Sequence, residues 1–490
     1  MQGQTDTGAE TVHSSSSTTR SSNPQPHIVI VGGGIIGCTT AYYILDALRS
    51  RTLEASYASL SFPPSSVDSN TNPQPKVTLL EASIHGPAQG ASGKAGGLLA
   101  KWAYPHELVD VSFSQHQALA ERHNGKDRWG FRFVKCGSWE GEVPGDDGDE
   151  EEEGEGYSGN KASGRRLPKD LLWLRESLTH SWSPLSSSDL KADTPSELAQ
   201  AQVHPYEFTT AMLELAKDMG LEYVQGRVTD IVVQPSGKGT QEVTGVQYLS
   251  PSTGSAAQSL DATHVLITAG AWSPSILSSM KGSRVRLPIK GSRAHSVTFR
   301  PPSPSIPVAP YIVFTQAARK RKSSKRQRIT TTSSSPDDSP FGDPEIYARP
   351  TNEIYACGAT DNSVPFPITV DDVQVDSKAC ARIVRDVGRI MDVKALATNQ
   401  LGEGGHNVVS LEELVHREQA CYLPVVTSGV EGPIVGEAKS IANGLYLGVG
   451  HTCWGICNAP GTAKALTELI LDGEIRCADL SALDPSRFLQ

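Results

Sequence analysis

The segment HIVIVGGGIIGCTTAYYIL, residues 27–45, constrains the fold most, because an apolar strand runs through three glycines into an apolar helix. In a nucleotide-binding turn of this kind, the first glycine permits the sharp turn, the second lets a pyrophosphate approach the backbone, and the third lets the helix pack on the strand. Gly32, Gly34 and Gly37 stand at these positions. The N–H groups at the start of the helix would then face the phosphates. The alternative interpretation is a tight turn that binds no ligand, and motifs elsewhere in the chain have to distinguish the two.

An acidic residue at the end of the second strand, about 20 positions after the glycines, normally binds a ribose hydroxyl in this unit. Glu81 closes the strand-like segment KVTLLE but lies 49 positions after Gly32. Residues 50–75 are rich in Ser, Pro and Asn, and without these 26 residues the separation becomes 23. We therefore interpret them as a loop inserted between helix and strand. A carboxylate at this place disfavours NADP and leaves NAD or FAD.

Strand-like and helix-like segments alternate along much of the chain, which is typical of a doubly wound, mostly parallel sheet. The strand-like segments are residues 27–31, 76–80 and 264–268, and the helix-like segments are residues 205–219 and 461–471. Residues 226–248 and 285–299 are β-rich without intervening helices and predict antiparallel pairing. The expected fold class is α/β (α+β), with a Rossmann-like domain and a discontinuous second domain built on a mainly antiparallel sheet.

Composition narrows the range of partners. The 490 residues carry a formal net charge of −10, so the surface should repel nucleic acids and anionic membranes, and a small molecule is the expected partner. No run of about 20 apolar residues predicts a membrane span, and the first residues lack the apolar centre of a secretory signal. The eight cysteines favour reduced thiols in a cytoplasmic protein. Their spacing predicts no metal site.

Three further segments are too polar to bury a core and are expected to be loops or disordered. They are a tail at residues 1–26, an acidic loop at residues 145–156 and a basic, serine-rich loop at residues 317–340. The basic run RKRKSSKRQR also fits a nuclear import signal or an anionic-surface contact, although solvated loops often contain such runs.

Further motifs follow Glu81 in order: SGKAGG, TAGAWS, PIVG, GHTCWGI and DPSRF. Together with GGGIIG, they resemble the D-amino acid oxidase-like family of FAD-dependent oxidoreductases, which includes glycine oxidase and sarcosine oxidase. The resemblance covers most of residues 27–490 outside the insertions. It implies FAD as the cofactor, whereas an NAD-dependent dehydrogenase would not explain the C-terminal motifs. The segments around SGKAGG and GHTCWGI are most similar to a fungal branch linked to late-endosome-to-Golgi transport.

The resemblance implies a discontinuous domain organisation and a set of cofactor contacts. The FAD-binding domain would comprise residues 27–125, 201–280 and 431–490, and the substrate domain residues 126–200 and 281–430. The ADP half of FAD would contact Gly32, Gly34, Ile35, Ile36, Gly37, Glu81 and Ala82. The remaining nucleotide and flavin contacts would come from Ser92, Lys94, Gly97, Val228, Ala269, Gly270, Trp272, Gly450, His451, Thr452, Trp454 and Gly455.

The implied reaction is oxidation of the C–N bond of an amine or amino acid, with hydride transfer to the flavin and reoxidation by oxygen. Such a site needs few catalytic side chains, because the cofactor carries the difficult step. A nearby positive charge would stabilise developing superoxide. The candidate catalytic residues are Lys290, Arg293 and His451. Each residue also has a purely structural interpretation. Lys290 and Arg293 would then be solvated or ion-paired strand residues, and His451 would be a hydrogen-bonded structural histidine.

One position departs from the family pattern. Members that oxidise free amino acids tend to have an arginine before a proline that grips the substrate carboxylate, but Leu423 stands there in CYLP. Arg349 is a possible substitute or an ordinary strand residue. A secondary amine or a larger amino compound is therefore as consistent as a simple D-amino acid. The alternative function is a FAD-bearing or catalytically silent protein of endosome-to-Golgi trafficking, with trafficking partners and a late-endosome association.

Overall fold

A six-stranded sheet forms the base of the first domain, and its strand order is β18-β19-β12-β1-β2-β8. All neighbours pair in parallel except β18 and β19. The strands are β1 (His27–Val31), β2 (Lys76–Glu81), β8 (Glu222–Gln225), β12 (His264–Ile267), β18 (Ile434–Glu437) and β19 (Leu445–Val449). The strand–helix alternation thus gives the parallel sheet that the sequence predicts.

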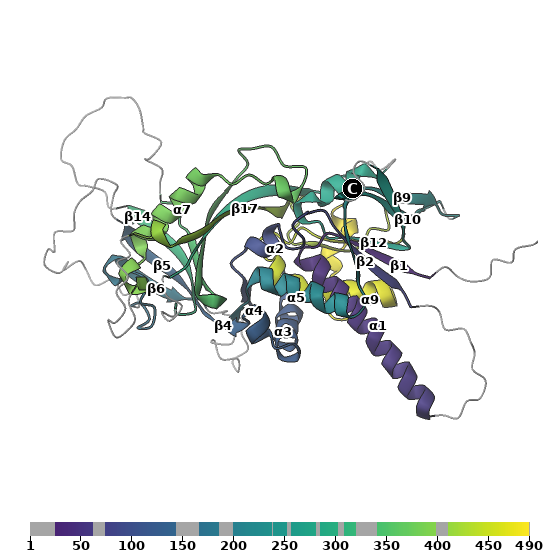
Figure 1. Cartoon of the computed structure of the whole chain (residues 1–490), viewed down its shortest axis with the longest axis horizontal. Helices are drawn as coiled ribbons and strands as arrows, with labels where there is room; N and C mark the ends of the chain where they lie inside the picture. Colours follow the sequence, from purple (N-terminus) through teal and green to yellow (C-terminus); the bar gives the residue numbers. More distant parts are fainter. Residues whose placement is uncertain are drawn as a thin grey trace, which may run out of the picture.

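Two layers cover this sheet, and β1 contacts both. Ile28 and Ile30 pack in the helical layer, whereas Val29 and Val31 pack against an antiparallel meander, because successive side chains of a strand point to opposite faces. The helices are α1 (Ile35–Ser61), α3 (His106–Arg122), α5 (Pro205–Asp218) and α9 (Gly455–Asp472). The meander consists of β9 (Arg227–Pro235), β10 (Gln241–Leu249) and β11 (Ala257–Asp261). Figure 1 shows the helices below the sheet and β9 and β10 of the meander above it.

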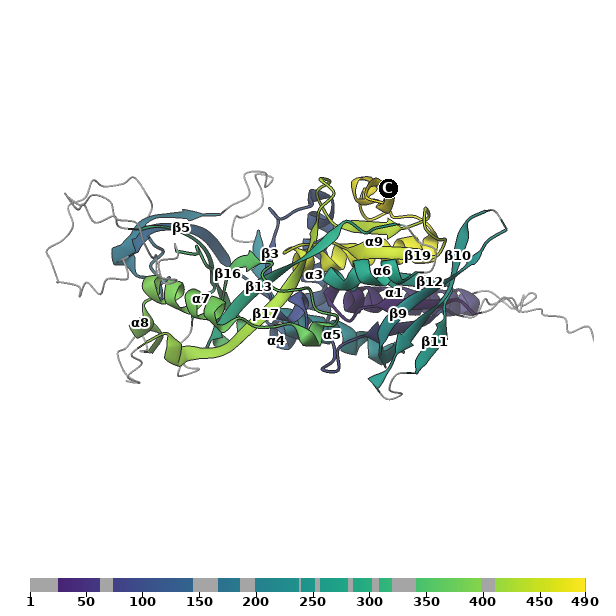
Figure 2. The same cartoon turned by 90° about the horizontal axis from the view of Figure 1, so that it is seen from above.

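A curved seven-stranded sheet forms the second domain, in the order β17-β13-β16-β15-β14-β5-β6, and all pairs are antiparallel except β14 with β5. The strands are β5 (Lys135–Val143), β6 (Thr179–Pro184), β13 (Ile289–Phe299), β14 (Tyr311–Arg319), β15 (Glu345–Arg349), β16 (Glu353–Asp361) and β17 (Val415–Val426). Helix α7 (Ser377–Ile390) covers one face, and β13 and β17 run back to the first domain (Figure 2). The mixed α/β fold class is therefore confirmed.

Smaller elements join the two domains. A three-stranded sheet is made of β3 (Leu98–Ala100), β7 (Gln200–Gln202) and β4 (Arg132–Phe133). The short helices are α2 (Ala91–Lys94), α4 (Gly125–Trp129), α6 (Ser273–Ser279) and α8 (Val393–Ala397). No helix among the described residues combines the length and the apolar character needed to cross a membrane.

The computed structural model describes ten segments of the chain: residues 25–61, 74–143, 166–185, 199–237, 239–251, 256–280, 285–301, 308–319, 341–397 and 410–489. The expected acidic loop at residues 145–156 lies outside them, as do nearly all of the N-terminal tail and most of the basic loop.

The expected loop at residues 50–75 is partly wrong, because α1 continues as helix to Ser61. The first part of this stretch, RTLEASYASL, contains Leu, Glu, Ala and Arg, which favour a helix, whereas the prolines and asparagines follow later. The two parts of this stretch therefore differ in helix propensity, although the composition of the whole stretch resembles that of a loop. Figure 1 shows the end of α1 projecting beyond the sheet.

Candidate cofactor groove and active site

The glycine turn after β1 is held by close backbone contacts. Gly32 has a φ of 113°, and a Cβ there would lie 2.9 Å from the Cα of Ala269. A Cβ on Gly37 would lie only 2.0 Å from the carbonyl oxygen of Gly32, so α1 could not sit against the turn with any larger residue. A Cβ on Gly34 would meet the Ser92 hydroxyl at 3.1 Å. These contacts are those expected of a turn that brings a ligand close to the backbone.

Glu81 faces this turn from the end of β2. Its Oε2 accepts a hydrogen bond from the Gly33 N–H at 2.6 Å, and its Oε1 accepts one from the Ser83 N–H at 2.7 Å. Burial raises the pKa of Glu81, and these two backbone donors oppose that effect. The carboxylate is thus fixed beside the glycines, where the sequence places the ribose contact.

A groove runs along the carboxyl ends of β1, β2, β12 and β19, the usual ligand position in an open parallel sheet. Most of the predicted cofactor residues line it: Gly32, Gly34, Ile35, Ile36, Glu81, Ala82, Ser92, Val228, Ala269, Gly270, Trp272, Gly450, His451, Thr452 and Gly455. The groove therefore offers FAD small residues against the phosphates and a carboxylate against the ribose. Segments far apart in sequence meet there, as a dinucleotide requires.

Four other predicted cofactor residues lie outside the groove lining. Gly37 and Gly97 serve backbone packing, since a Cβ on Gly97 would lie 2.0 Å from the Val203 carbonyl oxygen. Trp454 packs its ring against Trp102, with centroids 5.5 Å apart. The Lys94 ammonium donates to the Ala420 carbonyl oxygen of β17 at 3.0 Å, and burial lowers its pKa.

The two cations proposed on β13 are placed very differently. Arg293 is buried, and its guanidinium binds Asp361 through Nη2 at 2.9 Å and Nε at 3.2 Å, which is the ion-paired alternative that the sequence left open. Lys290 is exposed opposite Val425 and does not line the groove. A catalytic role for either residue stays a prediction.

His451 lies in the groove at the turn before α9. It is 4% exposed, and its Nε2 lies 3.0 Å from the Thr462 hydroxyl. Burial lowers the pKa of this imidazole to about 3. The neutral ring can hold a hydrogen bond near a cofactor, but it does not supply a positive charge at neutral pH.

We expect the His451 imidazole to keep its neutral-form chemical shift from neutral pH down to about pH 5, because the usual histidine pKa is about 6.5 and burial lowers this one. NMR of histidine ring protons, assigned with a His451→Gln variant, would measure this. Since the folded-state pKa is depressed, the associated stability is present above the unfolded pKa and is lost as pH falls through the folded value. A titration midpoint near pH 6.5 would contradict the assignment.

Sequence reasoning missed a strap along the groove, which consists of residues 368–371 in the connection between β16 and α7. Ile368, Thr369 and Val370 line the groove. Asp371 anchors the strap, because its carboxylate accepts from the Ser83 hydroxyl at 2.5 Å and from the Ile84 N–H at 2.9 Å. No motif marks these residues, since the strap binds the first domain only through tertiary contacts.

Replacing Asp371 by alanine should weaken FAD binding by up to about thirtyfold, because the strap loses its two anchoring hydrogen bonds, each worth about 1 kcal/mol. Isothermal titration of the apoprotein with FAD would measure this. An Asp110→Ala variant, altered on the exposed face of α3, should leave the affinity unchanged. Equal affinities for the two variants would show that the strap does not contribute.

The groove reaches the second domain at the end formed by the GHTCWGI turn. Tyr422 and Leu423 of β17 line it there together with Cys453 of that turn, and sequence reasoning missed Tyr422 as a groove residue. Beside them, aromatic rings connect the two domains: Trp454 packs on Trp102, and Trp102 packs on Phe314 of β14 at 6.2 Å. This arrangement supplies an apolar wall beside the groove.

Arg349 is not available as a substitute for the missing family arginine. Its Nη1 lies 2.9 Å from the Glu353 carboxylate, and Nη2 donates to the Ala95 carbonyl oxygen. The guanidinium also lies over the Tyr355 ring, 4.4 Å from its centroid. Leu423 therefore leaves the position of the family arginine apolar, and Arg349 performs a structural role.

All eight cysteines are free thiols. Within the described segments no group of three or more His, Cys, Asp or Glu side chains is placed to hold a metal ion.

Comparison with known proteins identifies the family. The chain is 28% identical to the Saccharomyces cerevisiae protein named "Putative oxidoreductase TDA3", over 96% of each chain. It is 27% identical to the Schizosaccharomyces pombe "Putative oxidoreductase C1F5.03c", over 95% of this chain and 99% of that protein.

Solved structures show the same fold at low identity. Glycine oxidase from Bacillus cereus superposes with a TM-score of 0.57 at 16% identity, covering 92% of this chain and 96% of that one. L-proline dehydrogenase from P. horikoshii gives a TM-score of 0.59 at 16% identity, covering 95% and 98%. The model of the FAD-dependent oxidoreductase family (DAO) matches residues 27–469. The chain therefore belongs to the DAO family of FAD-dependent oxidoreductases, as the glycine turn, Glu81 and the groove indicate.

Proposed function

We propose that this oxidoreductase oxidises the C–N bond of an amine or amino acid and that oxygen reoxidises the cofactor. The observation that carries the proposal is the continuity of the groove: Cys453 of the first domain and Tyr422 of the second both line it. A substrate held against the seven-stranded sheet would therefore meet the cofactor at this end. Bound FAD supplies the hydride acceptor.

The chain's own residues would orient the substrate and exclude water. The packed rings of Trp454, Trp102 and Phe314 lower the local polarity, and a site of low dielectric strengthens the electrostatic contacts inside it.

The test begins with the visible spectrum of the purified protein before and after acid precipitation. Flavin absorbance that remains in the supernatant would establish non-covalent FAD. Anaerobic addition of amines and amino acids should then bleach the flavin bands, and air should restore them. A protein that carries FAD but is bleached by none of these compounds would contradict C–N oxidation.

The trafficking role, the cytoplasmic location and the late-endosome association stay predictions. A colourless protein that fails to take up added FAD would favour the catalytically silent alternative. In that case the intact glycine turn and Glu81 would have only structural roles.

A further inference from the structure

A transverse row of side chains crosses the second domain's sheet. Phe314 lies opposite Glu345, Glu345 opposite Cys357, Cys357 opposite Ser296, and Ser296 opposite Gln419, each on a neighbouring strand. Directly opposed residues share one face of a sheet. The row therefore brings the Glu345 carboxylate of β15 into line with neutral side chains from β14, β16, β13 and β17.

This row lies on the face turned toward the FAD-binding domain. Tyr347 shares a face with Glu345, because residues two apart on a strand point the same way. A Cβ on Gly96 of the FAD-binding domain would lie 2.5 Å from the Tyr347 ring, so the two domains touch there. The intervening Ile346 instead packs in the core that includes α7.

The Glu345 carboxylate has no cationic partner among the residues that the structure describes. Its Oε2 accepts a hydrogen bond from the Tyr347 hydroxyl at 2.5 Å and lies 3.9 Å from the Cys357 sulfur. No Lys, Arg or His in the described part of the chain lies within ion-pair distance of it. The side chain is half-buried, so the charge is neither fully hydrated nor neutralised.

Glu345 does not itself line the groove, but Phe314, which lies opposite it, is connected through the rings of Trp102 and Trp454 to the turn that contains the groove residue Cys453. Although Cys453 is exposed, desolvation by the surrounding protein raises the pKa of its thiol most, and the negative charge of Glu345 raises it further. Burial and then Glu345 also raise the pKa of Tyr347 well above its usual value, so this hydroxyl stays protonated and donates. The aromatic contacts continue from Phe314 to Tyr347, with ring centroids 6.4 Å apart, and the faces of such rings attract cations.

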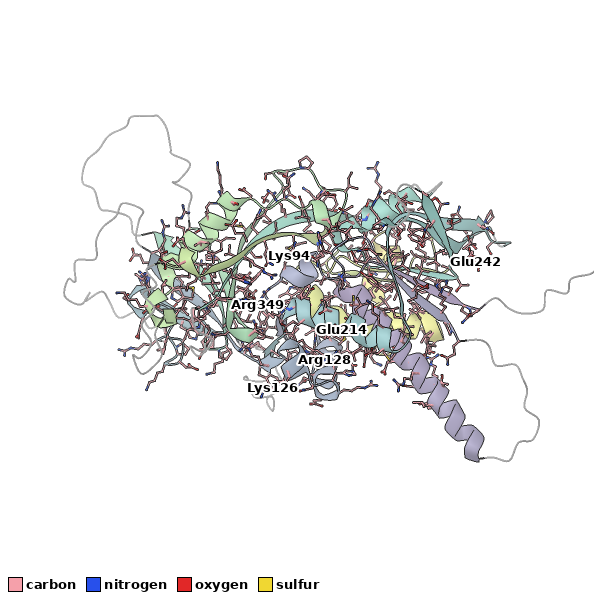
Figure 3. The ribbon with its side chains drawn as sticks, in the orientation of Figure 1. Lys94, Lys126, Arg128, Glu214, Glu242 and Arg349 are labelled. Carbon is pink, nitrogen blue, oxygen red and sulfur yellow. The ribbon has the colours of Figure 1, made fainter. Side chains whose placement is uncertain are left out.

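The nearby cations are held in place by the protein. Arg349 is paired with Glu353 and donates to the Ala95 carbonyl oxygen, whereas Lys94 donates to the Ala420 carbonyl oxygen of β17 and lies outside the groove lining. Figure 3 shows both cations in the middle of the molecule, where the two domains meet. A substrate carboxylate in this region would meet the uncompensated Glu345 and an apolar Leu423, whereas an ammonium group would find an anion and aromatic rings.

We propose that Glu345 determines substrate specificity by binding the ammonium group of an amine that carries no carboxylate. This inference rests on the proposed function, because it places the substrate beside the groove that holds FAD. It narrows the substrate class from amines and amino acids in general to organic cations.

The experiment compares matched ligands on the full-length holoprotein under anaerobic conditions. The probes are 2-phenylethylamine and butylamine, each paired with the amino acid that adds only a carboxylate, phenylalanine and norvaline. Binding is followed by the shift of the flavin absorbance and, independently, by thermal unfolding with each ligand. The amines should bind at least about tenfold more tightly than their paired amino acids, since a lost charged hydrogen bond or an added repulsion costs at least that factor.

The variants are Glu345→Gln, Glu345→Asp and, as a matched control, Glu242→Gln. Glu242 is exposed on β10, near one end of the molecule and away from Arg349 in its middle (Figure 3). Glu345→Gln should weaken amine binding about tenfold to a hundredfold while flavin content is retained. Glu345→Asp should recover part of the affinity because it restores the charge, and Glu242→Gln should bind amines like the unaltered protein.

The outcomes separate this inference from the function on which it rests. Amino acids that bind as tightly as the amines, an unchanged affinity in Glu345→Gln, or no binding of either amine would each overturn the role of Glu345. If amino acids bleached the flavin of the Glu345→Gln variant as much as that of the unaltered protein, the role of Glu345 would be overturned while C–N oxidation would be supported. Charge-dependent amine binding without bleaching would support the role of Glu345 and contradict the oxidation.

Discussion

Gly37→Ala should lower the affinity for FAD about 5- to 150-fold, because forcing a methyl group into a packed backbone contact costs about 1–3 kcal/mol. The added Cβ would lie 2.0 Å from the Gly32 carbonyl oxygen. Backbone atoms form this contact, so no side chain can rotate away. Helix α1 would have to move off β1, and the turn that faces the phosphates would move with it. Titration of the apoprotein with FAD measures the effect.

The matched control is Gly237→Ala, where an added Cβ would meet nothing within 4 Å. This variant should bind FAD like the unaltered protein. If Gly37→Ala also retained full affinity and an unchanged melting temperature, the glycine turn would not set the position of α1.

Arg349→Met should lower the free energy of unfolding by about 3–5 kcal/mol, the usual cost of removing one partner of a buried ion pair. The side chains of Arg349 and Glu353 are 3% and 6% exposed. Burial alone would raise the pKa of Glu353, but the hydrogen bonds and charges of His204 and Arg349 lower it to about 2. The Glu353 carboxylate is therefore charged at neutral pH and would lose the cation that lies closest to it. Urea denaturation at neutral pH measures the loss.

The pH dependence and a surface control test this explanation. Because the folded-state pKa of Glu353 is depressed, its contribution is present above the unfolded pKa of about 4.5 and is lost as pH falls toward about 2. Arg349→Met should weaken this acid dependence. Arg476→Met removes an exposed pair with Asp472 and should cost no more than about 1 kcal/mol. Equal losses for the two arginine variants would show that burial does not govern the cost.

Much of the first domain's fold could be predicted from residues that lie close together in the chain. The turn at Gly32, Gly34 and Gly37 and the strand ending at Glu81 follow local rules of backbone conformation and periodicity. They predicted a parallel sheet and a nucleotide groove, and the ordered motifs indicated FAD. The extension of α1 was missed because its helix-forming residues adjoin a stretch of prolines and asparagines.

The second domain could be predicted only as a β-rich region. Its sheet joins β14 to β5 in parallel, with Tyr311 opposite Lys135, and no local pattern specifies a pairing across such a separation. The same holds for Asp371, whose partners Ser83 and Ile84 come from the other domain. Arg349 could be named from sequence as a possible carboxylate ligand, but the pairing with Glu353 became visible only in the folded chain.

The nucleotide turn, the acidic residue beside it, the fold class and the family could be predicted from the sequence, because these depend on short-range spacing and on backbone conformations that few residues adopt. The folded structure was needed to show that Arg293 and Arg349 form ion pairs, that Lys290 is exposed, and that Glu345 has no cationic partner among the described residues. Charge compensation is a property of distances in space, and strand register sets those distances between residues that are remote in the chain.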